Sequence, residues 1–354
     1  MNKNAPVGHH PPLPARATIS DVAARAGVSK ATVSRFLNRR EELLTPEIAG
    51  RVERAVRALG YSPSPMAQAL KRGRSRLIGL VVADVANPFS VAVLRGAEKA
   101  CQDAGYLLML FNLGNEAGRE REAIEALLSY QVEGLILNTL GHDQGAVADA
   151  MRRGKPIVLV DRRHHELQTD FVSLDNAGAV RTAAEHLVAA GYRELLFVTE
   201  PLAGVSSRTE REAAFRAFLA DHPRLAGRTF ESGAEGTAAL DEALRALRKR
   251  ARTGKPAVLA SNAVITLRVA AAAARLGWRF GVDLGLVGFD ETEWAPLIGP
   301  GISTIAQPTD DLGRLAASCL LERLQGLALA PRQILLPGQL IARGSSLAPL
   351  KKVA

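Results

Sequence analysis

Short apolar runs alternate with amphipathic stretches from Leu77 to about residue 343. The runs are apolar along their whole length, which is typical of parallel strands covered by helices on both faces. The stretches between them repeat apolar residues at helical spacing. We therefore predict a doubly wound α/β body with two lobes, because two comparable series of strands follow one another. The predicted strands are 77–83, 106–111, 134–138, 157–160, 195–199, 257–261 and 284–289, and the predicted helices include 91–104, 119–130, 177–190, 211–220 and 263–276.

The segment before this body has a purely helical pattern. Residues 18–38 read TISDVAARAGVSKATVSRFLN. Thr18 or Ser20 can cap a first helix, and Gly27 ends that helix at a tight turn. Ser29 caps a second helix. Two short helices joined by a glycine turn predict a helix-turn-helix. A third helix follows, with its cap, its first residue and its end at Thr45, Pro46 and Gly60.

The solvent face of the second helix is polar and basic. In DNA-binding proteins of this type that face enters the major groove. Lys30 and Arg35 can donate to guanine edges, and Ala31 can contact a thymine methyl group. Hydroxyl and amide side chains suit phosphate contacts. The candidate DNA-contacting residues of the first two helices are Thr18, Ser29, Lys30, Ala31, Thr32, Ser34, Arg35 and Asn38.

The net charge of +9 lies entirely in the N-terminal segment. Residues 1–76 contain 14 Lys and Arg against 5 Asp and Glu, whereas the remaining residues contain 31 of each kind. A basic head on a neutral body indicates a module that binds a polyanion such as double-stranded DNA. The charge alone is also compatible with a sugar-binding protein or a metabolic enzyme that carries a solvated basic tail.

The segment between the head and the body reads YSPSPMAQALKRGRSR over 61–76. A proline-rich turn precedes a helical piece, 66–71, that is too short to be stable alone. It can fold only against a partner or a nucleic-acid groove, where Leu70 would act as a minor-groove wedge beside Lys71. An ordinary linker explains the same residues equally well.

Polar side chains follow the predicted strands of the body. Doubly wound sheets bind ligands beyond the carboxyl ends of their strands, and amides, carboxylates and guanidinium groups around an aromatic surface suit a sugar-like ligand. A carboxylate on that ligand needs a cationic partner, which Arg208 or Arg211 could provide. Several of these residues could instead only cap the following helices. The candidate effector-binding residues are Asp84, Asn87, Phe89, Asn138, Asp161, Arg208, Arg211, Asn262, Asp290 and Trp294.

Signatures of enzymes and of metal or membrane proteins are missing from the sequence. It contains no GxGxxG after the first strand, no P-loop, no GxSxG and no HExxH, so we predict neither an enzyme nor a cofactor. Cys101 and Cys319 lie far apart, which excludes a disulfide framework and a zinc finger. We expect His164 and His165 to be solvated rather than to bind a metal. No apolar run reaches the roughly 18 residues of a membrane span, and the N-terminus has no signal-peptide core, so we expect a cytoplasmic protein.

The head resembles the LacI/GalR family of bacterial transcription regulators. The resemblance rests on the TISDVA…AGVSKATVSRFLN run, then GYSPS, then AQALKRG, in that order. In the family the short piece after the Tyr-x-Pro turn is a hinge helix that folds in the minor groove of a dimer, which favours the wedge role of Leu70. Pro65 departs from many members of the family.

The body resembles the family's effector domain, which looks like periplasmic sugar-binding proteins. The similar stretches include DVANPFSVAVLRGAEKACQDAGY, YQVEGLILNT, VGFDETEW and STIAQP. The resemblance implies that Arg211, Asn262 and Asp290 occupy positions that commonly bind effector. Ala214 and Ala263 depart from the usual pattern. Within the family, several stretches look most like regulators that respond to ketogluconate-type sugar acids.

These observations predict a homodimeric, DNA-binding repressor that a sugar or sugar acid releases from a pseudo-palindromic operator. The effector would belong to the 2-ketogluconate or 2-keto-3-deoxygluconate class. The C-terminal tail lacks a heptad pattern, so we predict no helical tetramerisation bundle. The predicted parts are a disordered arm at 1–16, the helix-turn-helix at 17–62, the hinge and linker at 63–76, the effector and dimerisation domain at 77–343, and a short tail at 344–354.

Overall fold

The computed structural model describes residues 17–38, 40–63, 74–116, 118–139, 141, 143–164, 167–233, 237–251 and 255–347. The chain divides between Ser75 and Arg76 into two compact units, which we call the head and the body. The predicted hinge contacts Leu70 and Lys71 and the N-terminal arm lie outside the described residues.

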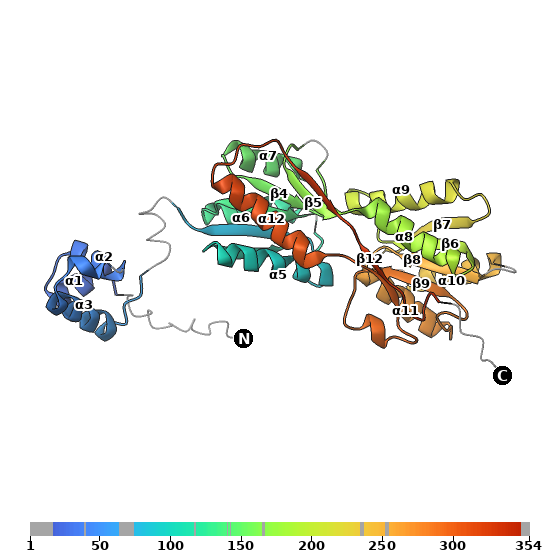
Figure 1. Cartoon of the computed structure of the whole chain (residues 1–354), viewed down its shortest axis with the longest axis horizontal. Coiled ribbons are helices and arrows are strands. Elements are labelled where there is room, and N and C mark those ends of the chain that lie inside the picture. The colour runs from blue at the N-terminus through green and yellow to red at the C-terminus, as the bar shows by residue number, and fades with distance from the viewer. Residues whose placement is uncertain are drawn as a thin grey trace, which may run out of the picture. The chain divides into compact units, whose positions relative to one another are not determined.

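The head is a three-helix unit, coloured blue in Figure 1. Thr18 caps the first helix by accepting from the backbone N–H of Asp21, and Asp21 accepts from Thr18 in return. Gly27, at φ 62°, ends that helix in the left-handed conformation that glycine adopts without strain. Ser29 caps the second helix. The helix-turn-helix is therefore as predicted, with Thr18 and not Ser20 as the cap. The elements are α1 (Ile19–Ala26), α2 (Lys30–Leu37), η1 (Glu41–Leu43) and α3 (Pro46–Ala58).

The core of the head is small and apolar. Val22 of α1, Val33 of α2 and Val52 of α3 are fully buried and belong to one cluster, together with three alanines. Each helix contributes the stripe that faces the other two, which leaves its opposite face to solvent.

The body contains two six-stranded sheets with the same strand order. Lobe 1 has the order β2-β1-β3-β4-β5-β11, and lobe 2 has the order β7-β6-β8-β9-β10-β12. The registered pairs are parallel, except that β12 runs antiparallel to β10. The strands are β1 (Leu77–Val82), β2 (Leu107–Asn112), β3 (Gly134–Asn138), β4 (Ile157–Val160), β5 (Asp170–Leu174), β6 (Tyr192–Thr199), β7 (Ala226–Glu231), β8 (Lys255–Ala260), β9 (Gly285–Phe289), β10 (Ser303–Ala306), β11 (Gln333–Leu336) and β12 (Gln339–Ile341).

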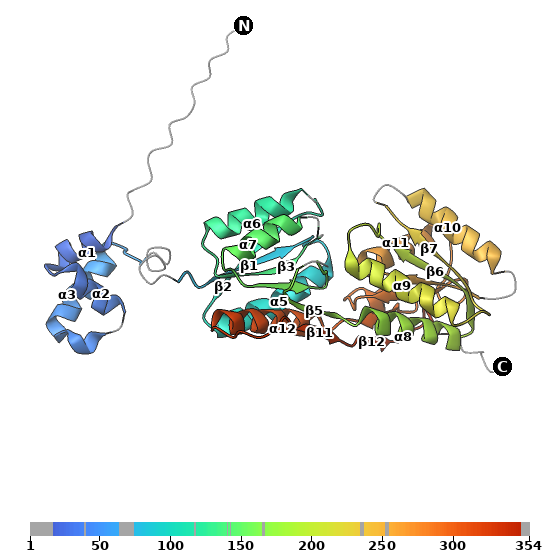
Figure 2. The ribbon, with the colours of Figure 1, turned by 90° about the horizontal axis from the view of Figure 1, so that it is seen from above.

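Helices cover both faces of each sheet, as the doubly wound prediction requires. Figure 2 shows α6 and α7 on one side of the lobe-1 sheet, and α5 and α12 on the other. In lobe 2, α10 and α11 pack on one apolar cluster and α8 and α9 on another. The helices are α5 (Pro88–Asp103), α6 (Arg119–Ser129), α7 (Gln144–Arg152), α8 (Asn176–Ala189), α9 (Ser206–Ala220), α10 (Thr237–Arg250), α11 (Ala263–Arg275) and α12 (Thr309–Leu324), with the short η2 (Ala295–Leu297).

The chain passes between the lobes three times: from β5 to α8, from β10 to α12 and from β11 to β12. The last of these passages is visible in dark red in Figure 1. The second passage brings α12 back to lobe 1, where it packs tightly on α5. A Cβ atom at Gly313 would lie 2.1 Å from the backbone oxygen of Val93, so only glycine permits this approach.

The structure corrects three predictions about the body. The edge strand β2 is not covered on both faces, because Leu107 and Leu110 are 66% and 42% exposed. Ser345 and Ser346, which we placed in the tail, are buried and bonded to lobe 2, since Ser345 Oγ donates to Leu286 O at 2.6 Å. The strand list was also incomplete, because β5, β7, β10, β11 and β12 were not predicted.

Candidate functional site

The outward face of α2 is the first candidate site. Val33 points into the core of the head, whereas Lys30, Ala31 and Arg35 are exposed. The side chains of Lys30 and Arg35 have no ion pair and no hydrogen bond to a described residue. The two cations are therefore available to an external anion or to a base edge.

The other polar residues of this face hold the local structure together. Ser29 and Thr32 share a hydroxyl hydrogen bond of 2.9 Å at the start of the helix. At its end, the amide of Asn38 donates to the backbone oxygen of Ser34 at 2.7 Å. Thr32 and Ser34 are half-buried rather than fully exposed. These four residues shape the ends of α2, which sets the direction in which Lys30 and Arg35 point.

The second candidate site lies in the body and has Arg211 at its centre. Its Nε donates to the Asn176 side chain at 2.8 Å, and Nη1 donates to the backbone oxygen of Ser261 at 2.5 Å. Nη2 contacts the Gln307 side chain at 3.4 Å and lies 3.9 Å from Oδ1 of Asp161. Arg211 thus joins lobe 2, the passage from β10 to α12, and lobe 1. It is 5% exposed, and burial lowers the pKa of its guanidinium despite the nearby carboxylates.

Two aspartates of this site occupy equivalent positions in the two lobes. Asp161 follows β4 and Asp290 follows β9, each the fourth strand from its own edge of the sheet in the shared order. Both have left-handed backbones, at φ 64° and 72°. Asparagine and aspartate tolerate this conformation at a cost, and such residues cluster at functional sites.

Asp290 is held by groups from two directions. Its Oδ2 accepts from the backbone N–H of Ala263 at 2.9 Å, and its Oδ1 accepts from Gln307 Nε2 at 2.6 Å. Burial raises the pKa of Asp290, against the stabilising effect of Arg211 and these hydrogen bonds on its charged form. Asp161, in contrast, accepts from the hydroxyl of Ser207 at 3.2 Å, which links the two lobes directly.

Arg208 and Asn262 are connected through one carboxylate. Oε2 of Glu200 accepts from Nη2 of Arg208 and from Nδ2 of Asn262, both at 2.7 Å. Nη1 of Arg208 donates to the backbone oxygen of Pro201 at 2.9 Å. Asn262 also caps α11 through its side-chain oxygen, which accepts from the Ile265 N–H. Arg208, Asn262 and Glu200 therefore form a closed group at the ends of β6 and β8.

Several hydroxyl groups at these strand ends lack a partner. Thr199 ends β6, Ser261 follows β8 and Thr292 follows β9 by three residues. Their hydroxyl oxygens are buried, and none has a hydrogen bond to a described residue. A buried hydroxyl without a partner costs free energy, so a group of three marks a place where a polar ligand would supply the missing bonds.

The remaining predicted site residues have local roles. Asn87 caps α5 by accepting from the Phe89 N–H at 3.1 Å, and Phe89 is buried in the lobe-1 core. Asp84 accepts from Asn115 at 2.8 Å, and Asn138 donates to the Val160 backbone oxygen at 3.0 Å. Trp294 packs on the lobe-2 core. Asn87 therefore acts as a helix cap, which was the alternative to an effector contact for some of the candidates.

Sequence reasoning missed Asn176, Glu200 and Gln307, which bind the predicted residues to one another. Glu200 directly follows a predicted strand, so the rule used for Asp84 would have found it. Two expectations were also wrong. His164 is buried rather than solvated, with Nε2 at 3.3 Å from the Thr139 hydroxyl. Arg211 does not begin a helix, because α9 begins at Ser206.

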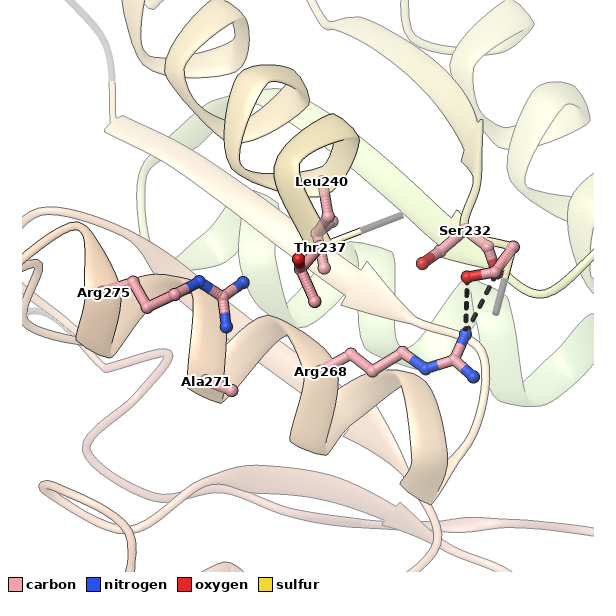
Figure 3. Close-up of a pocket in the computed structure, with 7 residues that line it drawn as sticks. Ser232, Thr237, Leu240, Arg268, Ala271 and Arg275 are labelled. Atoms are coloured by element: carbon pink, nitrogen blue, oxygen red, sulfur yellow. Dashed lines mark hydrogen bonds between the residues drawn. The ribbon is translucent and has the colours of Figure 1, made fainter. Parts of the chain in front are cut away.

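Two cavities lie outside this cluster. One, of about 90 Å³, lies between α10 and α11, and Figure 3 shows Arg268 reaching across it to the Ser232 and Gly233 carbonyls. It is smaller than an ordinary ligand pocket. The other, of about 730 Å³, is a groove between α5 and α12. Its charged residues are exposed and pair with one another, as Arg95 does with Asp310.

The described residues contain no group of three or more His, Cys, Asp or Glu placed to hold a metal ion. In the same part of the chain, no helix is both long enough and apolar enough to cross a membrane.

Comparisons with known proteins agree with this division into a head and a body. Residues 18–64 match the model of the bacterial regulatory proteins of the lacI family, and residues 184–346 match a periplasmic binding protein-like domain. The transcriptional regulator PtxS of Pseudomonas plecoglossicida is 48% identical over 94% of this chain and 96% of its own length. The transcriptional regulator KdgR of Bacillus subtilis (strain 168) is 40% identical over 93% and 97%.

Solved structures give the same picture. The lac repressor dimer bound to operator and the anti-inducer ONPF is 26% identical, with a TM-score of 0.80 over 94% of this chain and 99% of that one. A complex of the transcriptional regulator CelR with cellobiose, also 26% identical, has a TM-score of 0.66 over 93% and 100%.

Proposed function

The chain belongs to the lacI family of bacterial regulatory proteins, and we propose that it is a repressor released from DNA by a small sugar acid. As a member of that family it is a DNA-binding transcription regulator and not an enzyme. The proposal adds the sign of regulation, the class of effector and the residues that contact each partner. We also propose that it acts in the cytoplasm.

The DNA-reading surface in this proposal is the outward face of α2. Lys30 and Arg35 read base edges, and the residues at the ends of the helix contact phosphates. A symmetric dimer places two such helices about one DNA turn apart, so the operator is pseudo-palindromic.

A homodimer also accounts for apolar side chains that the single chain leaves in water. In lobe 1, Val91, Leu107 and Leu110 are 42–66% exposed, and in lobe 2 Leu267 is 49% exposed. Exposed apolar patches are typical of protein interfaces. Leu107 and Leu110 lie on the edge strand β2, which a single copy leaves uncovered.

The effector site in this proposal is the cluster around Arg211 at the strand ends. The observation that carries it is the group of three buried, unpartnered hydroxyls at Thr199, Ser261 and Thr292. A polyhydroxylated ligand supplies donors and acceptors to all three. Similarity to PtxS and KdgR favours the ketogluconate class among such ligands.

The effector acts by changing contacts that join the lobes. Ser207 donates to Asp161 at 3.2 Å, and the backbone N–H of Arg163 donates to Ser206 at 2.7 Å. Both contacts connect α9 of lobe 2 to the residues after β4 in lobe 1. A ligand that binds one arrangement of the lobes more tightly than the other shifts the population toward it, and the dimer transmits that shift to DNA.

The test begins with selection of an operator from random-sequence duplexes. Fluorescence anisotropy then measures the affinity of the full chain for that operator with and without 2-ketogluconate. We expect specific binding that is lost when residues 1–76 are deleted and that weakens when the sugar acid is added. If the sugar acid raises operator affinity, it is a co-repressor rather than an inducer. If no sugar acid changes operator affinity, this effector class is excluded.

A further inference from the structure

Three guanidinium groups gather around the candidate effector site: Arg162, Arg208 and Arg211. Arg211 directs all three of its nitrogens at side-chain or backbone oxygens, and Arg208 directs two nitrogens at a carboxylate and a carbonyl. Both arginines are thus occupied before any ligand arrives. A ligand carboxylate that bound to either would have to displace those partners.

Arg162 differs from both. It is 8% exposed, yet its side chain has one hydrogen bond to the described residues, from Nη1 to the Thr139 backbone oxygen at 3.2 Å. Its Nε is buried and has no hydrogen-bond partner. Oδ2 of Asp161 lies 3.7 Å from that Nε, which is too long for a hydrogen bond. A buried cation with unused donors is costly unless something else satisfies it.

The charges around Arg162 place it within the same site. Burial lowers its pKa, Asp161 and Glu200 raise the pKa, and Arg208 and Arg211 lower it. Three of those four neighbours belong to lobe 2, although Arg162 itself follows β4 of lobe 1. Geometry agrees, because Asp161 lies 3.7 Å from Nε of Arg162 and 3.9 Å from Nη2 of Arg211. Arg162 therefore lies close to lobe 2, and the two neighbouring cations favour the arrival of a further anion.

The unpartnered hydroxyls complete the chemistry of the ligand. Thr199, Ser261 and Thr292 all belong to lobe 2. One end of the site is thus a guanidinium with free donors, and the opposite lobe offers hydroxyls. A molecule with one carboxylate and several hydroxyl groups matches both ends.

On the basis of the proposed function, we infer that Arg162 binds the carboxylate of the effector and makes the site select sugar acids over neutral sugars. The planar fork of a guanidinium matches a carboxylate with two parallel hydrogen bonds. Arg208 and Arg211, which the sequence suggested for this role, instead hold the protein groups of the site in place.

A matched pair of ligands tests this assignment. 2-Ketogluconate and D-fructose have the same carbon skeleton. At one end, 2-ketogluconate has a carboxylate where D-fructose has a CH₂OH group. Calorimetric titration measures both ligands against the full-length wild type, Arg162→Met, Arg162→Lys and the control Arg153→Met. Arg153 is an exposed residue just after α7, with no ion pair to a described residue.

We expect the wild type and Arg153→Met to prefer the acid. Arg162→Met should bind 2-ketogluconate about 30-fold more weakly or worse, and should lose the preference, because a buried charge partner is gone. D-Fructose should bind Arg162→Met about as it binds the wild type. Arg162→Lys should bind the acid with intermediate affinity, since an ammonium keeps the charge but not the fork.

The outcomes separate this inference from the proposed function. If Arg162→Met still prefers the acid, the carboxylate binds elsewhere and the inference is wrong, while the proposed effector class stands. If the wild type binds D-fructose as tightly as 2-ketogluconate, both are wrong.

Stability without ligand gives a readout that is independent of binding. If the main role of Arg162 is to bind an anion, Arg162→Met keeps close to the wild-type midpoint of thermal unfolding. The variant loses one hydrogen bond to Thr139 and a 3.7 Å ion pair with Asp161, but it no longer buries a cation with an unused donor. A clear fall of the midpoint shows instead that Arg162 is a structural residue, which overturns the assignment.

Discussion

The head and the body hold their candidate functional side chains in opposite ways. In the head, Lys30 and Arg35 point outward from a helix whose other face is buried, and no described residue pairs with them. In the body, Arg211 and Asp290 are almost wholly buried and bonded to residues from several distant segments of the chain. A surface that reads a long polymer can be separate from the core beneath it. A site that surrounds a small ligand is itself part of the core.

This difference between head and body predicts different effects of mutations in the two regions. In the head, removal of a functional side chain should change binding and leave stability nearly unaltered. In the body, removal should change stability even without ligand. Each prediction below can break that distinction or make it sharper.

The largest effect is expected for Arg211→Ala. The substitution leaves the charges of Asp161 and Asp290 without their shared cation inside the body, and removing one partner of a buried ion pair costs about 3–5 kcal/mol. Urea unfolding of the full chain measures the loss. The control is Arg245→Ala on α10 of the same lobe, an exposed arginine with no ion pair to a described residue, whose removal should cost less than about 1 kcal/mol. Similar small losses for both would mean that the site around Arg211 is not part of the core.

The next effect depends on pH and concerns Asp170 in lobe 1. Burial raises the pKa of Asp170, but hydrogen bonds from Arg323 and Arg332 outweigh burial and hold the pKa at about 2. Because the folded-state pKa lies below the usual carboxyl pKa of 3.8, the carboxylate stabilises the body above about pH 4 and loses that contribution as the pH falls towards 2.

Asp170→Asn should therefore cost about 2 kcal/mol near pH 7. The difference in unfolding free energy between wild type and variant should shrink steadily below about pH 4. Chemical unfolding of both proteins at several pH values measures it. A difference that stays constant down to pH 2 would show that the two arginines do not stabilise the ionised form.

For the head, we expect Arg35→Ala to weaken binding to the specific operator by about 1–3 kcal/mol, because it removes hydrogen bonds to a base edge. Binding to random duplexes and the unfolding free energy should stay nearly unchanged. Anisotropy titrations on both kinds of DNA measure the effect, with Arg25→Ala on α1 as an exposed control. Equal losses on both DNAs would make Arg35 a phosphate contact.

The same contrast explains what could be predicted from the sequence. In the head, the cap Ser29, the turn glycine Gly27 and the exposed Arg35 lie within nine residues, so local periodicity and capping preferences determine their positions. The one ambiguity, between Thr18 and Ser20, depended on which hydroxyl reaches the Asp21 N–H, and that is set by the geometry of the first turn.

In the body, periodicity predicted most central strands because they are buried and apolar throughout. It missed β7 and β11, whose residues are exposed or half-buried. β7 is largely polar, and β11 offers only the short apolar run 334–336. For the candidate effector site, the sequence could predict only which polar residues follow strands. Their partners, such as Asn176 and Gln307, come from distant segments that meet only after the chain has passed between the lobes.

The smallest predicted effect concerns Thr18, which caps α1 and is also a candidate phosphate contact. Thr18→Ala removes the hydroxyl that accepts from the Asp21 N–H at 3.3 Å, and loss of such a cap costs about 1 kcal/mol. Hydrogen exchange of the head amides in the full chain should become about fivefold faster, and Thr18→Ser should restore protection because its hydroxyl can make the same bond. Thr18→Ala should weaken operator binding no more than Thr18→Ser does. A loss of affinity well beyond the loss of protection would show that the Thr18 hydroxyl contacts DNA as well as the helix. The head would then contain a residue that serves both the fold and the DNA-binding surface.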